Sequence, residues 1–78
     1  MTEHPRLTKR EEQILAFVQY GWRNREIAAK LSLSEAMIKL VIRQLLKKYR
    51  VKTRLELVVI TKFDGRDLNY PELPPPSD

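Results

Sequence analysis

One amphipathic segment, residues 35–49, constrains the fold of this 78-residue chain more than any other feature. Ser34, directly before it, is a good helix N-cap, and the apolar residues that follow recur at the helical period. With a turn of about 100° per residue, one face of the helix holds Ile38, Ile42, Leu45 and Tyr49. The opposite face holds Lys39, Leu40, Arg43 and Lys47 and continues to Arg50. Such a helix needs a core on one side and carries a basic surface on the other.

Three shorter helices are predicted around this one. The first starts at a capping box in residues 8–11 (Thr-Lys-Arg-Glu) and ends near Gly21, which is free to adopt positive φ. The second covers residues 24–31. The last starts at another capping box, residues 53–56 (Thr-Arg-Leu-Glu), and continues to about residue 63. We therefore predict an all-α fold, a bundle of four helices.

The chain is long enough for one domain and one small core. Residues 1–6 are predicted to be a flexible arm, residues 7–63 the folded domain, and residues 64–78 a disordered, Pro-rich tail. The starting Met1 and the self-contained tail favour a complete small protein over a part of a longer one.

Positive charge is concentrated on the predicted domain. Residues 1–63 contain 14 Lys and Arg against 6 Asp and Glu, a net charge of +8, whereas the remaining residues carry −3. This surplus indicates a polyanionic partner, either nucleic acid or an anionic membrane surface. An ordinary solvated helix face is the alternative.

Composition argues against several other classes of function. The chain has no cysteine, and its only histidine, His4, lies in the arm, so no thiolate zinc site or Ser/His/Asp set is expected. No metal-ligand cluster or Gly-rich phosphate loop is present, and we expect neither an enzyme nor a cofactor. No apolar run approaches the roughly 18 residues of a membrane span, and no secretory signal is visible.

Short matching pieces between residues 7 and 61 have the order and spacing of a known family. They are Leu7, Thr8, Arg10, Glu11, Ile14, Leu15, Gly21, Asn24, Glu26, Ile27, Ala28, Leu31, Ser34, Lys39, Lys48, Val51, Arg54 and Glu56. On these residues the chain resembles the LuxR/GerE-type helix-turn-helix family, which includes the output domains of NarL-like response regulators. The resemblance implies a cytoplasmic transcriptional regulator, in the bacterial cytosol or nucleoid, that binds specific sequences of double-stranded DNA.

The resemblance also implies separate roles for the second and third helices in DNA binding. The second helix supports the third, at about residues 35–49, which enters the major groove. Lys39, Leu40 and Arg43 are then the base-reading candidates: Arg and Lys bond to guanine, and Leu40 lies against a thymine methyl. The alternative is that these are solvated charges and one exposed leucine.

Other cations are candidates for DNA-backbone contact. Lys47, Lys48 and Arg50 lie near the end of the third helix, where they also favour the helix dipole. Asn24 and Arg25 are weaker candidates at the start of the second helix. Two further arginines have acidic alternatives: Arg10 and Arg54 either contact DNA or pair with Glu11, Glu26 or Glu56.

The last helix is apolar on two sides. Leu57, Val58 and Thr61 lie on the same side as Arg54, and Leu55, Val59 and Phe63 form a second stripe. Two apolar sides need two partners, so we predict that Leu55, Val59 and Phe63 form the interface of a homodimer. The alternative is that Phe63 and the tail fold back over the stripe.

Three positions depart from the family pattern. The family commonly has Thr where this chain has Met37, His where it has Val41, and Ser or Thr where it has Arg23. Met37 and Val41 are predicted to share one edge of the third helix with Lys48, where their apolar side chains remove polar contacts to the DNA backbone.

These apolar replacements motivate a second hypothesis. In it, the chain is a protein-interaction adaptor that keeps the helix-turn-helix scaffold but binds DNA poorly. The residues that would bind the partner protein are Met37, Leu40, Val41 and Gln44.

Overall fold

The computed structural model describes residues 5–63 as four α-helices with no strand among those residues. The helices are α1 (Lys9–Gln19), α2 (Asn24–Leu31), α3 (Glu35–Tyr49) and α4 (Arg54–Phe63). The predicted all-α bundle is confirmed. Most of the predicted arm, residues 1–4, and the whole predicted tail, residues 64–78, lie outside the described residues.

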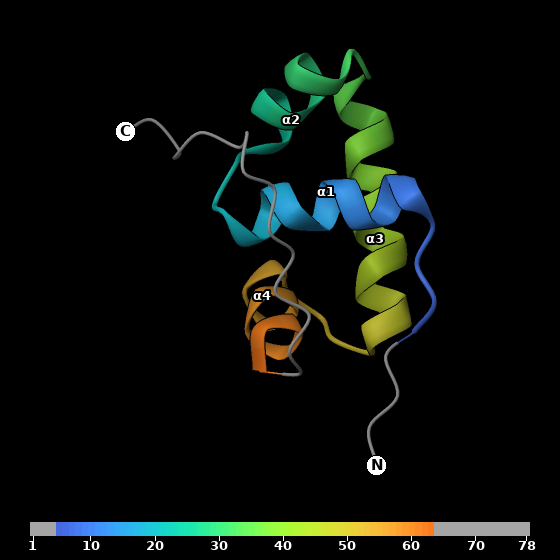
Figure 1. Ribbon diagram of the computed structural model, residues 1–78, viewed down its shortest axis with the longest axis vertical. Helices are drawn as coiled ribbons and strands as arrows, with labels where there is room; N and C mark the ends of the chain where they lie inside the picture. The colour runs from blue at the N-terminus through green and yellow to red at the C-terminus, as the bar shows by residue number, and fades with distance from the viewer. Residues whose placement is uncertain (1–4, 64–78) are drawn as a thin grey trace.

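The longest helix, α3, organises the bundle. In Figure 1, α1 crosses in front of α3, while α2 and α4 lie toward its two ends. α3 packs against each of the other three helices. Within residues 5–63, none of the helices has the length and apolar character that a membrane crossing requires.

The helix starts follow from local hydrogen bonds. The N–H of Thr8 donates to Oε1 of Glu11 at 2.8 Å, and the N–H of Glu11 donates to Oγ1 of Thr8 at 3.1 Å. The same reciprocal pair joins Thr53 and Glu56 before α4. After α1, Gly21 has φ 85°, a left-handed conformation that a residue without a Cβ adopts at little cost. Both predicted capping boxes and the predicted turn are confirmed.

The core lies where α3 meets its neighbours. The predicted core residues of α3 are all buried, as are residues of α1, α2 and α4 such as Leu15, Ile27 and Leu57. Val41 is buried as well, with 5% of its surface exposed, so its predicted place on the outer edge of the helix is wrong. Because three helices pack around α3, its buried arc is wider than the stripe that the sequence periodicity indicated.

A buried polar contact fixes α4 against α1. Nε2 of Gln19 donates to Oγ1 of Thr61 at 2.9 Å, and that hydroxyl in turn donates to the carbonyl of Leu57 at 2.8 Å. A buried polar group without a partner would destabilise the fold, and here the two side chains satisfy each other. The orientation of α4 relative to the bundle is thereby specified.

Candidate nucleic-acid interface

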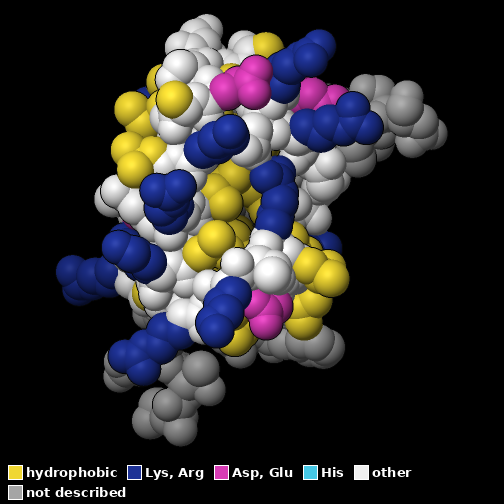
Figure 2. All heavy atoms as spheres, turned by 180° about the vertical axis from the view of Figure 1, so that it is seen from behind, with side chains coloured by type: hydrophobic (Ala, Val, Ile, Leu, Met, Phe, Trp, Pro, Cys, Tyr) yellow, Lys and Arg dark blue, Asp and Glu magenta, His cyan; other side chains and the backbone are white. Residues whose placement is uncertain are grey.

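The outer face of α3 is exposed and basic. Its N-terminus is capped by Ser34, whose Oγ accepts the N–H of Met37 at 3.1 Å. At its other end Arg50 adopts a left-handed conformation with φ 58° and ends the helix. The exposed side chains of the predicted interface on this face are Lys39, Leu40, Arg43, Lys47 and Arg50. Figure 2 shows the back of the molecule, where Lys and Arg side chains lie along the surface with apolar side chains between them.

Lys48 differs from these cations because protein groups already bind its ammonium. Its Nζ lies 2.7 Å from Oε1 of Glu11 and 2.9 Å from the carbonyl oxygen of Arg6, and donates to both. The predicted role of Lys48 was phosphate contact. In the structure its ammonium joins α3 to the segment that begins α1.

Glu11 is the buried partner in this pair. Only 5% of its surface is exposed. Burial raises the pKa of Glu11, but the hydrogen bonds from Lys48 and from the Thr8 backbone together outweigh it, so the pKa lies below its usual value. The carboxylate therefore stays ionised and holds Lys48 in place.

Arg54 makes a second link that the sequence did not predict. Its Nη1 donates to Oδ1 of Asn24 and its Nη2 donates to the carbonyl of Trp22, which joins the start of α4 to the start of α2. The guanidinium is half-buried, and burial lowers the pKa of Arg54. Asn24 is thus occupied inside the protein. In the sequence, the one indication of this contact is that Asn24 and Arg54 both belong to the family pattern.

The acidic partners named as one alternative for Arg54 make other contacts in the structure. Glu11 binds Lys48. Glu26 and Glu56 accept backbone N–H groups at the start of their own helices. Arg54 donates instead to neutral oxygens, those of the Asn24 side chain and the Trp22 backbone.

Within residues 5–63, hollows lie at the starts of α1 and α2. One, of about 530 Å³, is lined by Gly21, Trp22, Arg23, Asn24, Arg25, Glu35 and Arg54. The side chain of Arg25 is exposed here, as a phosphate contact requires. Trp22 packs edge-on against Phe17 with ring centroids 4.5 Å apart, which makes it a packing residue.

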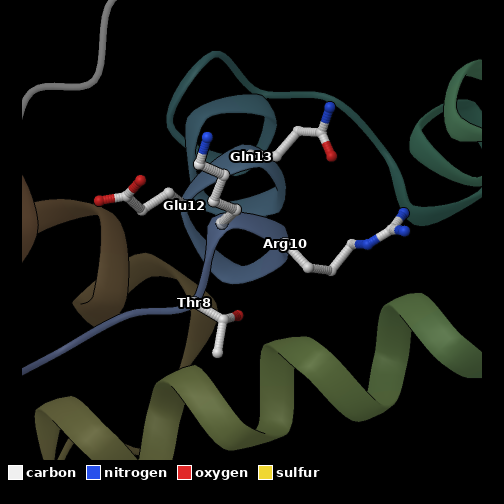
Figure 3. Close-up of a pocket in the computed structure, with 5 residues that line it drawn as sticks. Thr8, Arg10, Glu12 and Gln13 are labelled. Carbon is white, nitrogen blue, oxygen red and sulfur yellow. The ribbon is translucent and has the colours of Figure 1, made fainter.

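The other hollow, of about 700 Å³, lies on the first turns of α1 and is shown in Figure 3. All its lining residues come from residues 8–13. Arg10 and Gln13 extend to the opposite side of the helix from Glu12, so the polar groups do not converge on one point. In residues 5–63 no group of three or more His, Cys, Asp or Glu side chains is placed to hold a metal ion.

The two sides of α4 have different surroundings. Leu57 and Thr61 are fully buried, whereas Leu55 and Val59 are 73% and 43% exposed. The side chain of Phe63, the third member of the predicted dimer stripe, lies outside the described residues. The described part of the stripe is therefore available to a partner.

Comparisons with known proteins identify relatives of this domain. Residues 5–61 match the model of a family described as "Bacterial regulatory proteins, luxR family". The response regulator protein TmoT of Ectopseudomonas mendocina is 39% identical over 56 residues, which are 72% of this chain and 26% of TmoT. The nitrate/nitrite response regulator protein NarL of Escherichia coli strain K12 is 38% identical over 53 residues, 68% of this chain and 24% of NarL. The transcriptional regulatory protein DesR of Bacillus subtilis strain 168 is 36% identical over 59 residues, 76% of this chain and 30% of DesR. The chain thus spans about a quarter of the length of these curated relatives.

Proposed function

The chain belongs to the luxR family of bacterial regulatory proteins, and from that premise we propose that it binds specific sequences of double-stranded DNA through α3. Family membership supports DNA-binding regulation in general. The finer statement rests on one observation: α3 buries one face in the bundle and exposes a basic face that includes Lys39 and Arg43. A recognition helix needs this division, because its outer face enters the major groove while its inner face is held by the domain.

Base reading falls to three exposed side chains on the outer face of α3. Arg43 and Lys39 donate to the O6 and N7 acceptors of guanine, and Leu40 lies beside them on the outer face. Because α3 is capped at Ser34 and packed against three helices, these side chains project from a rigid support.

Phosphate contact is assigned to Lys47, Arg50 and Arg25, whose side chains are exposed. Lys48 and Asn24 were predicted for the same role, but their polar groups bind other parts of the protein. We assign these two to positioning: they hold α3 and α2 in the orientation in which the exposed cations meet the DNA backbone.

The α4 stripe supports a symmetric dimer. Leu55 and Val59 are exposed apolar side chains one turn apart, and Phe63 follows at the same spacing in the sequence. A two-fold pairing there would present two α3 helices to half-sites about one DNA turn, roughly 34 Å, apart and would favour palindromic sites.

Selection from a pool of random duplexes tests the proposal. The protein is incubated with the pool at low and at moderate salt, and the retained duplexes are sequenced. We expect enrichment of a common sequence at moderate salt and less selective binding at low salt, where phosphate contacts dominate. Retention of duplexes without any enriched sequence at either salt concentration would contradict specific recognition.

An adaptor function is the second candidate. Met37 and Leu40 on α3 are 42% and 48% exposed, and a partner protein could bury both. Val41, which was predicted to extend this surface, is buried and cannot contribute. The remaining surface is small, and it adjoins the basic residues of α3.

A further inference from the structure

The outer face of α3 consists of two parallel stripes. Lys39, Arg43, Lys47 and Arg50 form the basic stripe. Met37, Leu40 and Gln44, all exposed, form an uncharged stripe beside it. At about 100° per residue, residues of the two stripes lie about 20–160° apart around the helix, with Leu40 next to the basic stripe and Met37 farthest from it.

Met37 and Leu40 lie on an ordered part of α3. The N–H of Met37 donates to the Ser34 cap, so the backbone at the start of α3 is fixed. Val41, one turn after Met37 on the adjoining side, is buried in the core. The two apolar side chains therefore project from an ordered helix.

Charge restricts what can cover the uncharged stripe. Any molecule that covers it also approaches the basic stripe, because both lie on one helix about 10 Å wide. The occupant therefore combines negative charge with small apolar groups. The major groove of DNA has this combination: phosphates line it, and the 5-methyl group of thymine is the apolar group on its floor.

We propose that Met37 and Leu40 form a methyl-reading edge, which recognises the 5-methyl groups of pyrimidines at two nearby positions of the DNA site. The inference rests on the proposed function, because it requires α3 in the major groove. Residues three apart are about 4.5 Å apart along the helix axis, compared with about 3.4 Å between successive nucleotides. Both side chains thus reach methyl groups on adjacent or next-adjacent base pairs.

The methyl group itself is the recognised feature, so 5-methylcytosine is read in the same way as thymine. Both bases carry the group at the same position of the major groove. An unmethylated cytosine at such a position then lowers the affinity for the duplex. Methylation of that cytosine restores part of the apolar contact and of the affinity. This makes binding sensitive to a modification of DNA that leaves base pairing unchanged.

The test replaces single thymines of a selected duplex by deoxyuridine, which keeps every hydrogen-bonding group and lacks only the methyl. For the unaltered protein we expect the dissociation constant to rise about fourfold for each contacted methyl, as for loss of one buried apolar carbon. Met37→Ala and Leu40→Ala should each abolish the thymine–uracil difference at one position. A duplex with cytosine at that position should regain affinity when the cytosine is methylated.

Lys47→Ala is the matched control. It removes a phosphate contact from the neighbouring stripe, so it should weaken binding to the thymine and uracil duplexes equally and keep their ratio. The ratio is measured within each variant, so a change in the folded fraction does not affect it.

Two negative results are distinguishable. Equal binding of thymine and uracil duplexes, by a protein that still selects a DNA sequence, would overturn the methyl-reading edge and leave the proposed function standing. Failure to bind any duplex at low salt would overturn both.

Discussion

Replacement of Lys48 by methionine isolates the contact between α3 and the start of α1. Methionine keeps the apolar stem of the side chain but removes the ammonium that binds Glu11 at 2.7 Å. A hydrogen bond to a charged group contributes about 1.5–3 kcal/mol to stability. The Lys48 side chain is 35% exposed, and water replaces part of the lost interaction, so we expect a loss of about 1–2 kcal/mol. For a domain of this size that lowers the melting temperature by about 4–16 °C.

Lys47→Met is the matched control. It makes the same chemical change one residue earlier, at an exposed position on the other side of α3. Its effect on stability should stay within about 0.5 kcal/mol. Urea unfolding followed by far-UV circular dichroism measures both variants, and a cycle with Glu11→Gln isolates the energy of the pair itself.

The pH dependence gives an independent check. The pKa of Glu11 is lower in the folded protein than the usual glutamate value of 4.5, so its ionised form stabilises the fold above that pH. That stability is lost as pH falls from about 4.5 toward the lower folded-state pKa. The backbone N–H groups of Lys52 and Thr53 lower the pKa of Glu56. Glu56 therefore adds a similar dependence of stability on pH, which wild type and Lys48→Met share. The difference between wild type and Lys48→Met should therefore shrink in acid. Equal urea midpoints for Lys48→Met and wild type, with parallel acid profiles, would refute the reasoning.

The remaining predictions concern the other contacts. Arg43→Ala should weaken binding to a selected duplex by about 1–3 kcal/mol and relax the preference at one base. Lys47→Ala should weaken binding to all duplexes and lower the slope of log K against log salt by about one. Fluorescence anisotropy measures both. Identical behaviour of the two on every duplex would exclude base reading by Arg43. Val59→Asp should give a monomer in sedimentation where the wild type is a dimer; a monomeric wild type, with and without DNA, would contradict the α4 interface. Arg54→Leu should destabilise the fold by about 1–3 kcal/mol, because Asn24 and a backbone carbonyl lose their donor. An unchanged urea midpoint would show that water replaces the guanidinium.

The helices could be predicted because their signals are local. A capping box joins residues three apart, and both boxes have the predicted partners. The core face of α3 follows from the helical period alone. Val41 was misplaced for the same reason: periodicity gives the angle of a side chain, but the width of the buried arc depends on how many helices pack around it.

The roles of Lys48 and Arg54 could not be predicted in this way. Their partners Glu11 and Asn24 lie 37 and 30 residues away in the chain, and only the crossing of the helices brings them together. For Arg54, opposite charge makes carboxylates candidate partners in the sequence. Glu26 and Glu56 instead accept backbone N–H groups at the starts of their own helices, and the neutral partners of Arg54 carry no charge that the sequence pattern could match.

This division of cations changes the expected electrostatics of DNA binding. Seven Lys and Arg residues occur between positions 39 and 54, which suggests seven counterions released by one subunit. Lys48, however, is ion-paired with Glu11, and Arg54 donates to Asn24 and a backbone carbonyl, so we expect neither to be a main phosphate contact. Five cations remain in this stretch, and at about 0.9 per neutralised phosphate they contribute at most about 4.5 to the slope of log K against log salt. We therefore expect the strongly basic composition to overstate the charge available to DNA, because Lys48 and Arg54 also join α3 and α4 to the rest of the domain.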